Sequence, residues 1–430
     1  MRSDGGGRRK PAVLLTLATL CGAVLPEAST AATYYVDGAN ASDTAAGTTA
    51  ATAYHSFAKA MTALAPGDHL MIAAGRYDEP LRITVSGNAR APLVIEGAAG
   101  ALPVIVAASD AVSVEADYVT LSRVNAASTG PMGSAIVVQA GHHHVTISHV
   151  IAHDSGCAGI AGLQTDYIAI RHNVVYGNGR SSPWQCSGIS LYQAADFDTA
   201  PGFHNVIADN IVYRNVNLVP DPKLTGPSAG HTTDGNGIII DDFRHTQTWR
   251  GQRTPAYSNS TLVENNVAFD NGGRGIQVFF SDHVTVRNNT VYRNLQDRRL
   301  LGTAFGEIQV VSSTAVTVAN NLIVPSQDHG VGLLAVDTNS VVADYNVSIG
   351  ERPPYDTLHA TLAWGAHNHA GRSPGFRIEG SGELLPDLHL TTASDALGRA
   401  DPAQAPAEDL DGRSRTRARH VDAGAYQLSE

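Results

Sequence analysis

The chain has 430 residues, with 42 glycines and only 16% charged residues, which indicates many tight turns and little exposed helix. Its formal net charge of −11 disfavours nucleic acid and anionic membrane surfaces as partners. A chain of this length holds either two ordinary domains or one extended array of repeats.

The N-terminus has the pattern of a secretory signal. A basic segment (residues 8–10) precedes an apolar run (11–24) that is too short to span a bilayer, and small residues follow up to Ala32. We expect cleavage near Ala32 and a secreted or periplasmic protein with no membrane insertion. Removing residues 1–32 takes away four basic and two acidic residues, so the net charge changes from −11 to −13.

The first elements after the signal are a strand at 33–37, a short helix at 56–64 and a strand at 69–73. Phe57 and Met61 lie on one face of the helix, at a spacing of four residues. We expect this helix to cap the N-terminal end of the repeats that follow.

From there to residue 350, short apolar runs alternate with turns, and several of these units share one asparagine. The equivalent asparagines are Asn173, Asn210, Asn266, Asn289, Asn321 and Asn346. Their shortest separation, 23 residues, is one coil of a parallel β-helix, and longer separations indicate inserted loops or a skipped coil. Stacked side-chain amides would pair with the turn backbone of neighbouring coils, although asparagine also simply suits left-handed turns.

A second type of strand follows these units and carries one isoleucine that we expect to point inward. These residues are Ile160, Ile189, Ile238, Ile276 and Ile308. They would stack about 4.8 Å apart, one per coil. The sequence therefore predicts an all-β chain with about a dozen coils over residues 33–350 and a C-terminal tail at 351–430 that packs along them.

The same register predicts a disulfide. Cys157 lies three residues before Ile160, and Cys186 lies three residues before Ile189. The two cysteines should therefore lie on adjacent coils, close to the distance that a disulfide spans, and an exported protein favours the bond.

The stretch 231–244 concentrates carboxylates around a short strand. Asp234 precedes the run Ile238–Ile240, and Asp241 and Asp242 follow it, although strands are otherwise poor in aspartate. A solvated strand end with a capped turn would explain the pattern without any function. By the register the first and last isoleucines of the run point inward, so Asp241 points outward in the same column as Tyr192 and Phe279 on neighbouring coils.

Several residues near this stretch have side chains suited to chemistry on a polysaccharide. Arg274 stacks on Asn236 by register, and Lys223 lies in an insertion that should fold over the same face. Either could act as the base in a β-elimination, although Arg274 could instead form a salt bridge with Asp234 or Asp241. His231 could act as an acid or base near neutral pH.

Hydrolysis would instead need two carboxylates on either side of the bond, and Asp241 and Asp242 are the candidates. Candidate substrate-binding residues surround these acids on the same face. They are Tyr192, Gln277, Phe279, Arg244, His245, Trp184 and Trp249.

Both ends of the mature chain resemble secreted right-handed parallel β-helix proteins of the pectate-lyase-like superfamily. The resemblance rests on Tyr34–Asp37, Pro66–Asp68 and Gly75–Glu79 near the start, and on Asp411–Arg413 and Asp422–Tyr426 near the end. It covers nearly the whole mature chain and implies a right-handed parallel β-helix with a short N-terminal capping helix.

Within that superfamily the pattern is nearest to the family 9 polysaccharide lyases. The resemblance implies a calcium site made of aspartates, here Asp234, Asp241 and Asp242, and a lysine that abstracts the C5 proton of a uronic acid. This chain departs from the pattern, because Ile239 stands where those lyases carry that lysine.

These observations leave three hypotheses for the function. The first is a secreted, monomeric lyase that cleaves an acidic, uronate-containing polysaccharide. The second is a glycoside hydrolase that uses aspartates on the same face. The third is a non-catalytic polysaccharide-binding or adhesin-type β-helix.

Overall fold

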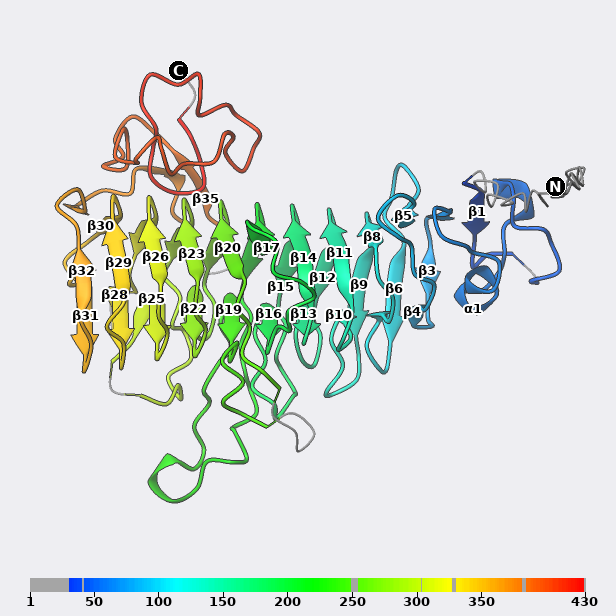
Figure 1. Ribbon diagram of the computed structural model, residues 1–430, viewed down its shortest axis with the longest axis horizontal. Helices are drawn as coiled ribbons and strands as arrows, with labels where there is room; N and C mark the ends of the chain where they lie inside the picture. Colours follow the sequence, from blue (N-terminus) through cyan, green and yellow to red (C-terminus); the bar gives the residue numbers. More distant parts are fainter. Residues whose placement is uncertain are drawn as a thin grey trace, which may run out of the picture. The chain divides into compact units, whose positions relative to one another are not determined.

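The computed structural model describes residues 31–40, 42–248, 254–302, 304–326, 330–380 and 384–428. Three parallel sheets, which we name A, B and C, make up most of this part of the chain (Figure 1). From residue 69 to residue 358, each coil contributes one strand to sheet A, then one to B, then one to C, as in a parallel β-helix. The predicted parallel β-helix is thereby confirmed, and the twelve strands of sheet A agree with about a dozen coils.

Within each sheet, strands from successive coils are direct neighbours. Sheet A consists, in stacking order, of β1 (Thr33–Val36), β2 (His69–Ile72), β5 (Leu93–Gly97), β8 (Val119–Ser122), β11 (His143–Ser148), β14 (Asp166–Arg171), β17 (Phe203–Ala208), β20 (Ser260–Glu264), β23 (Val284–Arg287), β26 (Val316–Ala319), β29 (Val341–Asp344) and β32 (Leu362–Trp364). Sheet B consists of β3 (Arg76–Tyr77), β6 (Val104–Ala107), β9 (Asn125–Ser128), β12 (Ile151–His153), β15 (Val174–Tyr176), β18 (Ile211–Tyr213), β21 (Val267–Phe269), β24 (Thr290–Tyr292), β27 (Leu322–Val324), β30 (Val347–Ile349) and β33 (His369–Gly371). Sheet C consists of β4 (Leu81–Ile83), β7 (Val112–Val114), β10 (Ile136–Val138), β13 (Ile160–Leu163), β16 (Ile189–Tyr192), β19 (Ile238–Asp241), β22 (Ile276–Phe279), β25 (Gly306–Val311), β28 (Val331–Val336) and β31 (Tyr355–Leu358).

The interior of the coils is a stack of aliphatic side chains. The predicted inward residues Ile160, Ile189, Ile238, Ile276 and Ile308 are paired in register and are all fully buried. β-Branched residues fit this pleated, closely packed environment, so the hydrophobic pattern and the strand propensity favour the same structure.

The asparagine ladder forms as predicted along the turn between sheets A and B. The amide oxygen of Asn266 accepts from the backbone and side-chain nitrogens of Asn210, at 3.0 and 2.9 Å. Its own nitrogen donates to Ile207 O at 2.9 Å and to Asn289 Oδ1 at 3.0 Å. Each amide therefore satisfies buried polar groups on the coils above and below.

A second ladder lies between sheets B and C and was not predicted. Asn178, Asn215, Asn271 and Asn294 repeat the same contacts, and the row ends on the carboxylate of Glu307. Each of these asparagines follows a member of the first ladder by five residues, a constant offset that the sequence already contains. Burial raises the pKa of Glu307 to about 7, although three hydrogen bonds from Asn294 and Ser326 lower it.

The helix near the N-terminus, α1 (Phe57–Met61), is shorter than the expected 56–64. Ser56 accepts a hydrogen bond from the Lys59 backbone at its start, and Phe57 and Ala60 are buried. Its role as a cap stays a prediction. Two 3₁₀ turns, η1 (Ala50–Thr52) and η2 (Gly226–Ser228), complete the helical elements of the described residues.

The coils continue beyond the predicted boundary at residue 350. Strands β31, β32 and β33 extend sheets C, A and B as far as Gly371. The expected boundary was one coil short because the segment 351–354 interrupts the repeated pattern, whereas the structure places it in the turn before β31.

The segment after Gly371 packs against the outside of sheet B. It contains the antiparallel pair β34 (Phe376–Ile378) and β35 (Asp387–Leu390). Its apolar residues form a second core with outward side chains of sheet B. That core includes Phe269, Tyr292, Leu322, Val347, Phe376, Leu388, Leu390, Ala423 and Tyr426.

Candidate active site

The outward side chains at the ends of the sheet C strands form a continuous row. We name this the outer row, and it comprises Leu163, Tyr192, Asp241, Phe279, Val311, Val336 and Leu358. Each member is at least partly exposed. The register thus places Asp241 between Tyr192 and Phe279, as the sequence predicted.

The parallel row two residues earlier on the same face is buried over four successive coils. These residues are Ile239, Gln277, Gln309 and Leu334, whereas Ser190 and Asp356 on the flanking coils are not buried. Ile239, the residue at the position of the lysine in the family 9 pattern, is therefore inaccessible to a polymer. A ligand on this face of sheet C meets the outer row.

Asp242 lies immediately after Asp241, but its carboxylate is fully occupied by the protein. It is completely buried and accepts from Gln193 Nε2, Thr246 N, Thr246 Oγ1 and Gln247 N at 2.6–2.8 Å. Asp242 lies just after β19 at a turn position with a positive φ of 52°, so its side chain leaves the outward row and enters the protein. Asp242 therefore anchors the loop after β19, and it has no oxygen left for a substrate.

Asp241 presents the opposite situation. Among the described residues, none donates a hydrogen bond or forms an ion pair with its side chain. Burial raises the pKa of Asp241 well above its ordinary value, and the charges of Asp234 and Asp242 raise it further, whereas Lys223 lowers it. The carboxyl group is thus held in its protonated form over a wider pH range than an exposed aspartate.

Asp234 lies close enough to Asp241 for its charge to raise the pKa of Asp241. Burial raises the pKa of Asp234 to about 6, against the lowering effects of the Arg274 guanidinium and of a hydrogen bond from Asn236 Nδ2 at 3.2 Å. At neutral pH Asp234 is therefore mainly ionised, and its charge contributes to the raised pKa of Asp241. Two carboxyls on one face thus have different environments, the arrangement from which acid and base roles are assigned.

The Arg274 side chain is buried and contacts protein groups, so it does not face a ligand. Its side chain is only 6% exposed, and it donates to Gln309 Oε1 at 2.9 Å and to Thr233 O at 2.7 Å. Its backbone N–H donates to Asn236 Oδ1 at 2.8 Å, so it stacks on Asn236 as the register predicted. Burial lowers the pKa of Arg274 to about 10, which leaves it charged at neutral pH and unsuited to act as a base there.

Asn236 joins these groups and was not predicted as a site residue. Its nitrogen lies within 3.0–3.2 Å of Gln277 Oε1, Asp234 Oδ1 and Ser187 Oγ. The amide therefore orients Asp234 and ties the predicted substrate residue Gln277 into the protein. The sequence contains one indication of this role, because the register pairs Asn236 with Arg274 on the next coil.

Lys223 and Trp184 extend over this face from two inserted loops. The exposed Lys223 ammonium lies 5.9 Å from the centre of the Trp184 ring and acts electrostatically on Asp241. Trp184 is 62% exposed, and its indole N–H lies 3.3 Å from the sulfur of Met132. The exposed ring of Trp184 offers a surface on which a sugar ring can pack.

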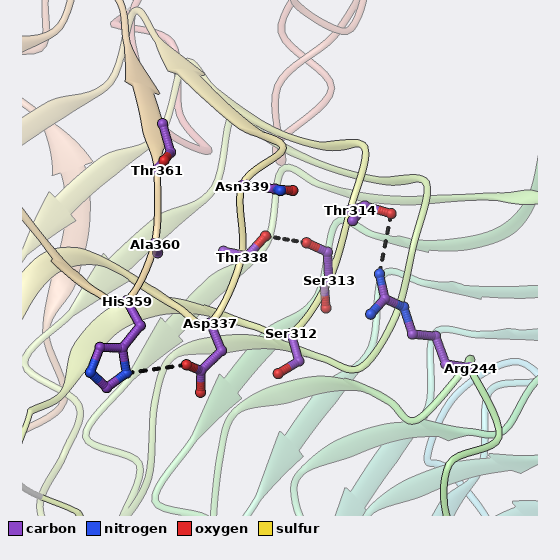
Figure 2. Close-up of a pocket in the computed structure, with 10 residues that line it drawn as sticks. All are labelled: Arg244, Ser312, Ser313, Thr314, Asp337, Thr338, Asn339, His359, Ala360 and Thr361. Atoms are coloured by element: carbon purple, nitrogen blue, oxygen red, sulfur yellow. Dashed lines mark hydrogen bonds and ion pairs between the residues drawn. The ribbon is translucent and has the colours of Figure 1, made fainter.

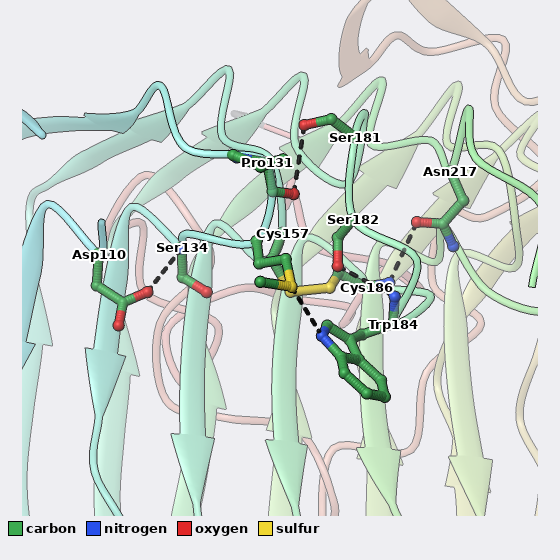
Figure 3. Close-up of a disulfide and its surroundings, with 10 residues drawn as sticks. Asp110, Pro131, Ser134, Cys157, Ser181, Ser182, Trp184, Cys186 and Asn217 are labelled. Atoms are coloured by element: carbon green, nitrogen blue, oxygen red, sulfur yellow. Dashed lines mark hydrogen bonds between the residues drawn. A yellow bond between two sulfur atoms is a disulfide. The ribbon is translucent and has the colours of Figure 1, made fainter. Parts of the chain in front are cut away.

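A disulfide braces the loop that carries Trp184 (Figure 3). Cys157 and Cys186 are bonded with a Cα–Cα distance of 5.2 Å, which confirms the prediction from the register. Asn217 Oδ1 accepts from the Cys186 backbone at 3.1 Å, so the loop that carries Lys223 is attached at the same place.

The remaining predicted residues that the structure describes are held by contacts within the protein. Arg244 forms a bidentate ion pair with Asp282 at 2.7 and 2.8 Å. His245 is buried between Ala194 O and Thr254 Oγ1, so it holds a loop. His231 Nδ1 lies 3.0 Å from Ser228 O within its own turn. Trp249 lies outside the described residues.

The three aspartates proposed for calcium do not fit a metal site in this structure. Across the described ranges there is no group of three or more His, Cys, Asp or Glu side chains that could hold a metal ion. Asp242 already accepts four hydrogen bonds from the protein, so its carboxylate has no free oxygen to offer a cation. A calcium requirement stays a prediction from the resemblance alone.

Comparison with known proteins supports the fold. The family model described as "Right handed beta helix region" matches residues 225–349. The crystal structure of pectate lyase Pel9A is similar over 93% of this chain and 97% of its own, at 14% identity and a TM-score of 0.50. The structure of XylC in complex with xylose is similar over 93% of this chain and 98% of its own, at 10% identity and a TM-score of 0.55.

A family GH136 lacto-N-biosidase from Eubacterium ramulus covers 79% of this chain and 68% of its own, at 13% identity and a TM-score of 0.45. No curated protein sequence matches the chain. No helix in the described part of the chain is long and apolar enough to cross a membrane. At these identities, the similarities to Pel9A and XylC establish a parallel β-helix, and the reaction has to be argued from the site itself.

Proposed function

We propose that the protein is a secreted polysaccharide-degrading enzyme in which Asp241 donates a proton to the oxygen of the bond that is cleaved. The observation that carries this proposal is the environment of Asp241. Its carboxyl faces outward between two aromatic residues of the outer row, has no hydrogen-bond partner in the described protein, and has a raised pKa. A general acid that works near neutral pH needs these properties.

Hydrolysis is the reaction that this geometry supports best. Asp241 would protonate the glycosidic oxygen as the bond between that oxygen and the anomeric carbon breaks. Asp234, ionised above a pKa of about 6, would either take a proton from the attacking water or attack the anomeric carbon itself. The configuration of the first product, followed by NMR, distinguishes these two routes. No step depends on calcium.

A lyase reaction is the second candidate, and Lys223 is the observation in its favour. The exposed Lys223 amine lies within electrostatic range of Asp241 and is the candidate base for the C5 proton of a uronic acid. Lys223, after losing its proton, would remove the C5 proton while Asp241 protonates the leaving oxygen. The β-helix fold that the chain shares with the pectate lyase Pel9A is compatible with this reaction.

Replacement of the central carboxyl tests the proposal. We expect Asp241→Asn to lower kcat by about 10²- to 10⁴-fold, the usual contribution of a general acid, with little change in the melting temperature. The assay measures reducing ends and the ultraviolet absorbance of unsaturated products on neutral and acidic polysaccharides. Asp78→Asn, which changes an exposed aspartate of an early coil, is the control.

The products also separate the candidate reactions. Reducing ends without unsaturation, lost in Asp234→Asn and retained in Lys223→Ala, support hydrolysis. Unsaturated products, lost in Lys223→Ala, support a lyase. Full activity of Asp241→Asn would rule out this site, and binding without any cleavage by the wild type would leave a polysaccharide-binding scaffold.

A further inference from the structure

A groove of about 660 Å³ lies on the turns that follow the sheet C strands (Figure 2). Its lining residues are Arg244, Ser312, Ser313, Thr314, Asp337, Thr338, Asn339, His359, Ala360 and Thr361. Nine of these ten side chains are polar, and the volume is in the range of small-ligand sites. The candidate acid and base residues Asp234, Asp241 and Lys223 do not line this groove.

The register of the coils places this groove directly beside the outer row. Val311, Val336 and Leu358 belong to that row, and Ser312, Asp337 and His359 are the next residues on three successive coils. These three corner residues all have a positive φ, so they occupy equivalent turn positions. Arg244, at the other end of the groove, follows Asp241 by three residues. A chain lying on the outer row at Asp241 would therefore continue alongside this groove.

The charges that line the groove are paired within the protein. Arg244 is neutralised by its bidentate contact with Asp282, and Thr314 binds the same carboxylate at 2.8 Å. His359 Nδ1 lies 3.3 Å from Asp337 Oδ1. A polyanion would require cations that are free to face it, and a polycation would require free carboxylates. The groove supplies neither, so it favours an uncharged ligand.

The groove also has side chains that are free to form hydrogen bonds with the hydroxyl groups of a ligand. The side chains of Ser312, Asn339 and Thr361 line the groove and have no hydrogen-bond partner in the described protein. Together they offer two hydroxyls and an amide, groups that both donate and accept. Sugar hydroxyls also do both, so neutral sugars match this lining.

We propose that the groove binds uncharged sugar units of the polysaccharide, on the C-terminal side of Asp241. The inference rests on the proposed function in taking the outer row as the path of the substrate. It goes beyond that function by assigning the substrate class, a neutral glycan, and by adding Asn339 and Thr361 as binding residues. The strand spacing of about 4.8 Å gives a path of roughly 19 Å from β19 to β31, enough for several sugar rings.

Calorimetric titration of the full-length Asp241→Asn protein tests the groove without cleavage of the ligand. The probes are xylohexaose and cellohexaose as neutral glycans, and hexagalacturonate as the acidic one. We expect a neutral hexasaccharide to bind more tightly than hexagalacturonate. Adding Asn339→Ala and Thr361→Val should weaken that binding by about tenfold, because two hydrogen bonds are lost. Thr48→Ala, an exposed threonine far from the groove in sequence, should leave it unchanged.

A further variant tests the groove by filling it, and so does not depend on the loss of single hydrogen bonds. Ala360→Trp should fill the groove and weaken the same binding, and circular dichroism verifies the fold of each variant. The proposal is overturned if hexagalacturonate binds most tightly, if no probe binds, or if the groove variants bind as the parent does. These outcomes are separate from the role of Asp241, because that role is measured by cleavage and this one by binding.

Discussion

Asp241 and Asp242 are neighbours in the chain, and their carboxyl groups lie on opposite sides of the backbone. The buried Asp242 accepts four hydrogen bonds and holds a loop, whereas the outward Asp241 accepts none from the described protein. The difference arises because Asp241 is the last residue of β19, whereas Asp242 begins the turn with a positive φ. Asp241 is therefore the candidate catalytic residue, and Asp242 has a structural role. Amino-acid composition alone cannot distinguish the two.

The two working carboxyls predict a bell-shaped dependence of kcat/KM on pH. Hydrolysis needs Asp234 ionised, so activity should rise as the pH increases through about 6. It also needs Asp241 protonated, so activity should fall again once the pH passes the raised pKa of Asp241.

Two variants of Arg274 test the acid limb of the dependence of kcat/KM on pH. Its positive charge lowers the pKa of Asp234, so Arg274→Met should move the acid limb to higher pH. Arg274→Lys keeps the charge and should leave that limb close to the wild-type position. Identical limbs in the two variants would remove Asp234 from the profile.

At the scale of the elements, the asparagine ladders fix the turns between the sheets. Each interior amide has partners on two neighbouring coils, so the ladders couple one coil to the next. The sequence predicted the first ladder from its repeat. The second escaped because two of the longer intervening segments, at 177–188 and 214–237, obscure the repeat of sheet C.

Replacing an interior ladder residue should destabilise the protein strongly. Asn266→Ala removes four hydrogen bonds and leaves buried groups of Asn210, Ile207 and Asn289 unpaired. We expect a loss of about 3 kcal/mol or more in the free energy of unfolding, measured with urea.

The end of the same ladder offers the matched control. Asn368 is only partly buried and has no further ladder residue beyond it in the described chain, so Asn368→Ala should cost about 1 kcal/mol. Equal losses at the two positions would contradict the view that the buried partners of Asn266 cause its larger loss of stability.

At the scale of the whole molecule, the C-terminal segment covers the outside of sheet B. Arg415 joins it to the coils from a buried position, with donations to Asn265 Oδ1 at 3.2 Å and to Gly424 O at 2.9 Å. The buried carboxylates of Asp409 and Asp422 act on the same guanidinium. The buried Arg415 guanidinium therefore helps to balance charge at the junction between the tail and the solenoid, and Arg413 Nη1 also lies 3.7 Å from Asp409 Oδ2.

Removing this cation should loosen the tail. Arg415→Leu removes the buried cation that faces Asp422 and Asp409 and should lower the free energy of unfolding by about 3 kcal/mol or more. Arg76→Leu removes an exposed ion pair with Asp78 and should cost at most about 1 kcal/mol. Urea denaturation compares them, and comparable losses would contradict a structural role specific to Arg415.

The sequence by itself determined the parallel β-helix, the first ladder, the disulfide and the position of Asp241 between Tyr192 and Phe279. All four follow from a strict repeat, because stacking coils bring residues at equal offsets together. Only the tertiary structure decided which acidic side chains are free, that Arg274 is buried, and that, among the described residues, the three aspartates do not converge on a metal. Those outcomes depend on loops without a repeat, and a loop's path is set by packing and hydrogen bonds that its own sequence does not specify.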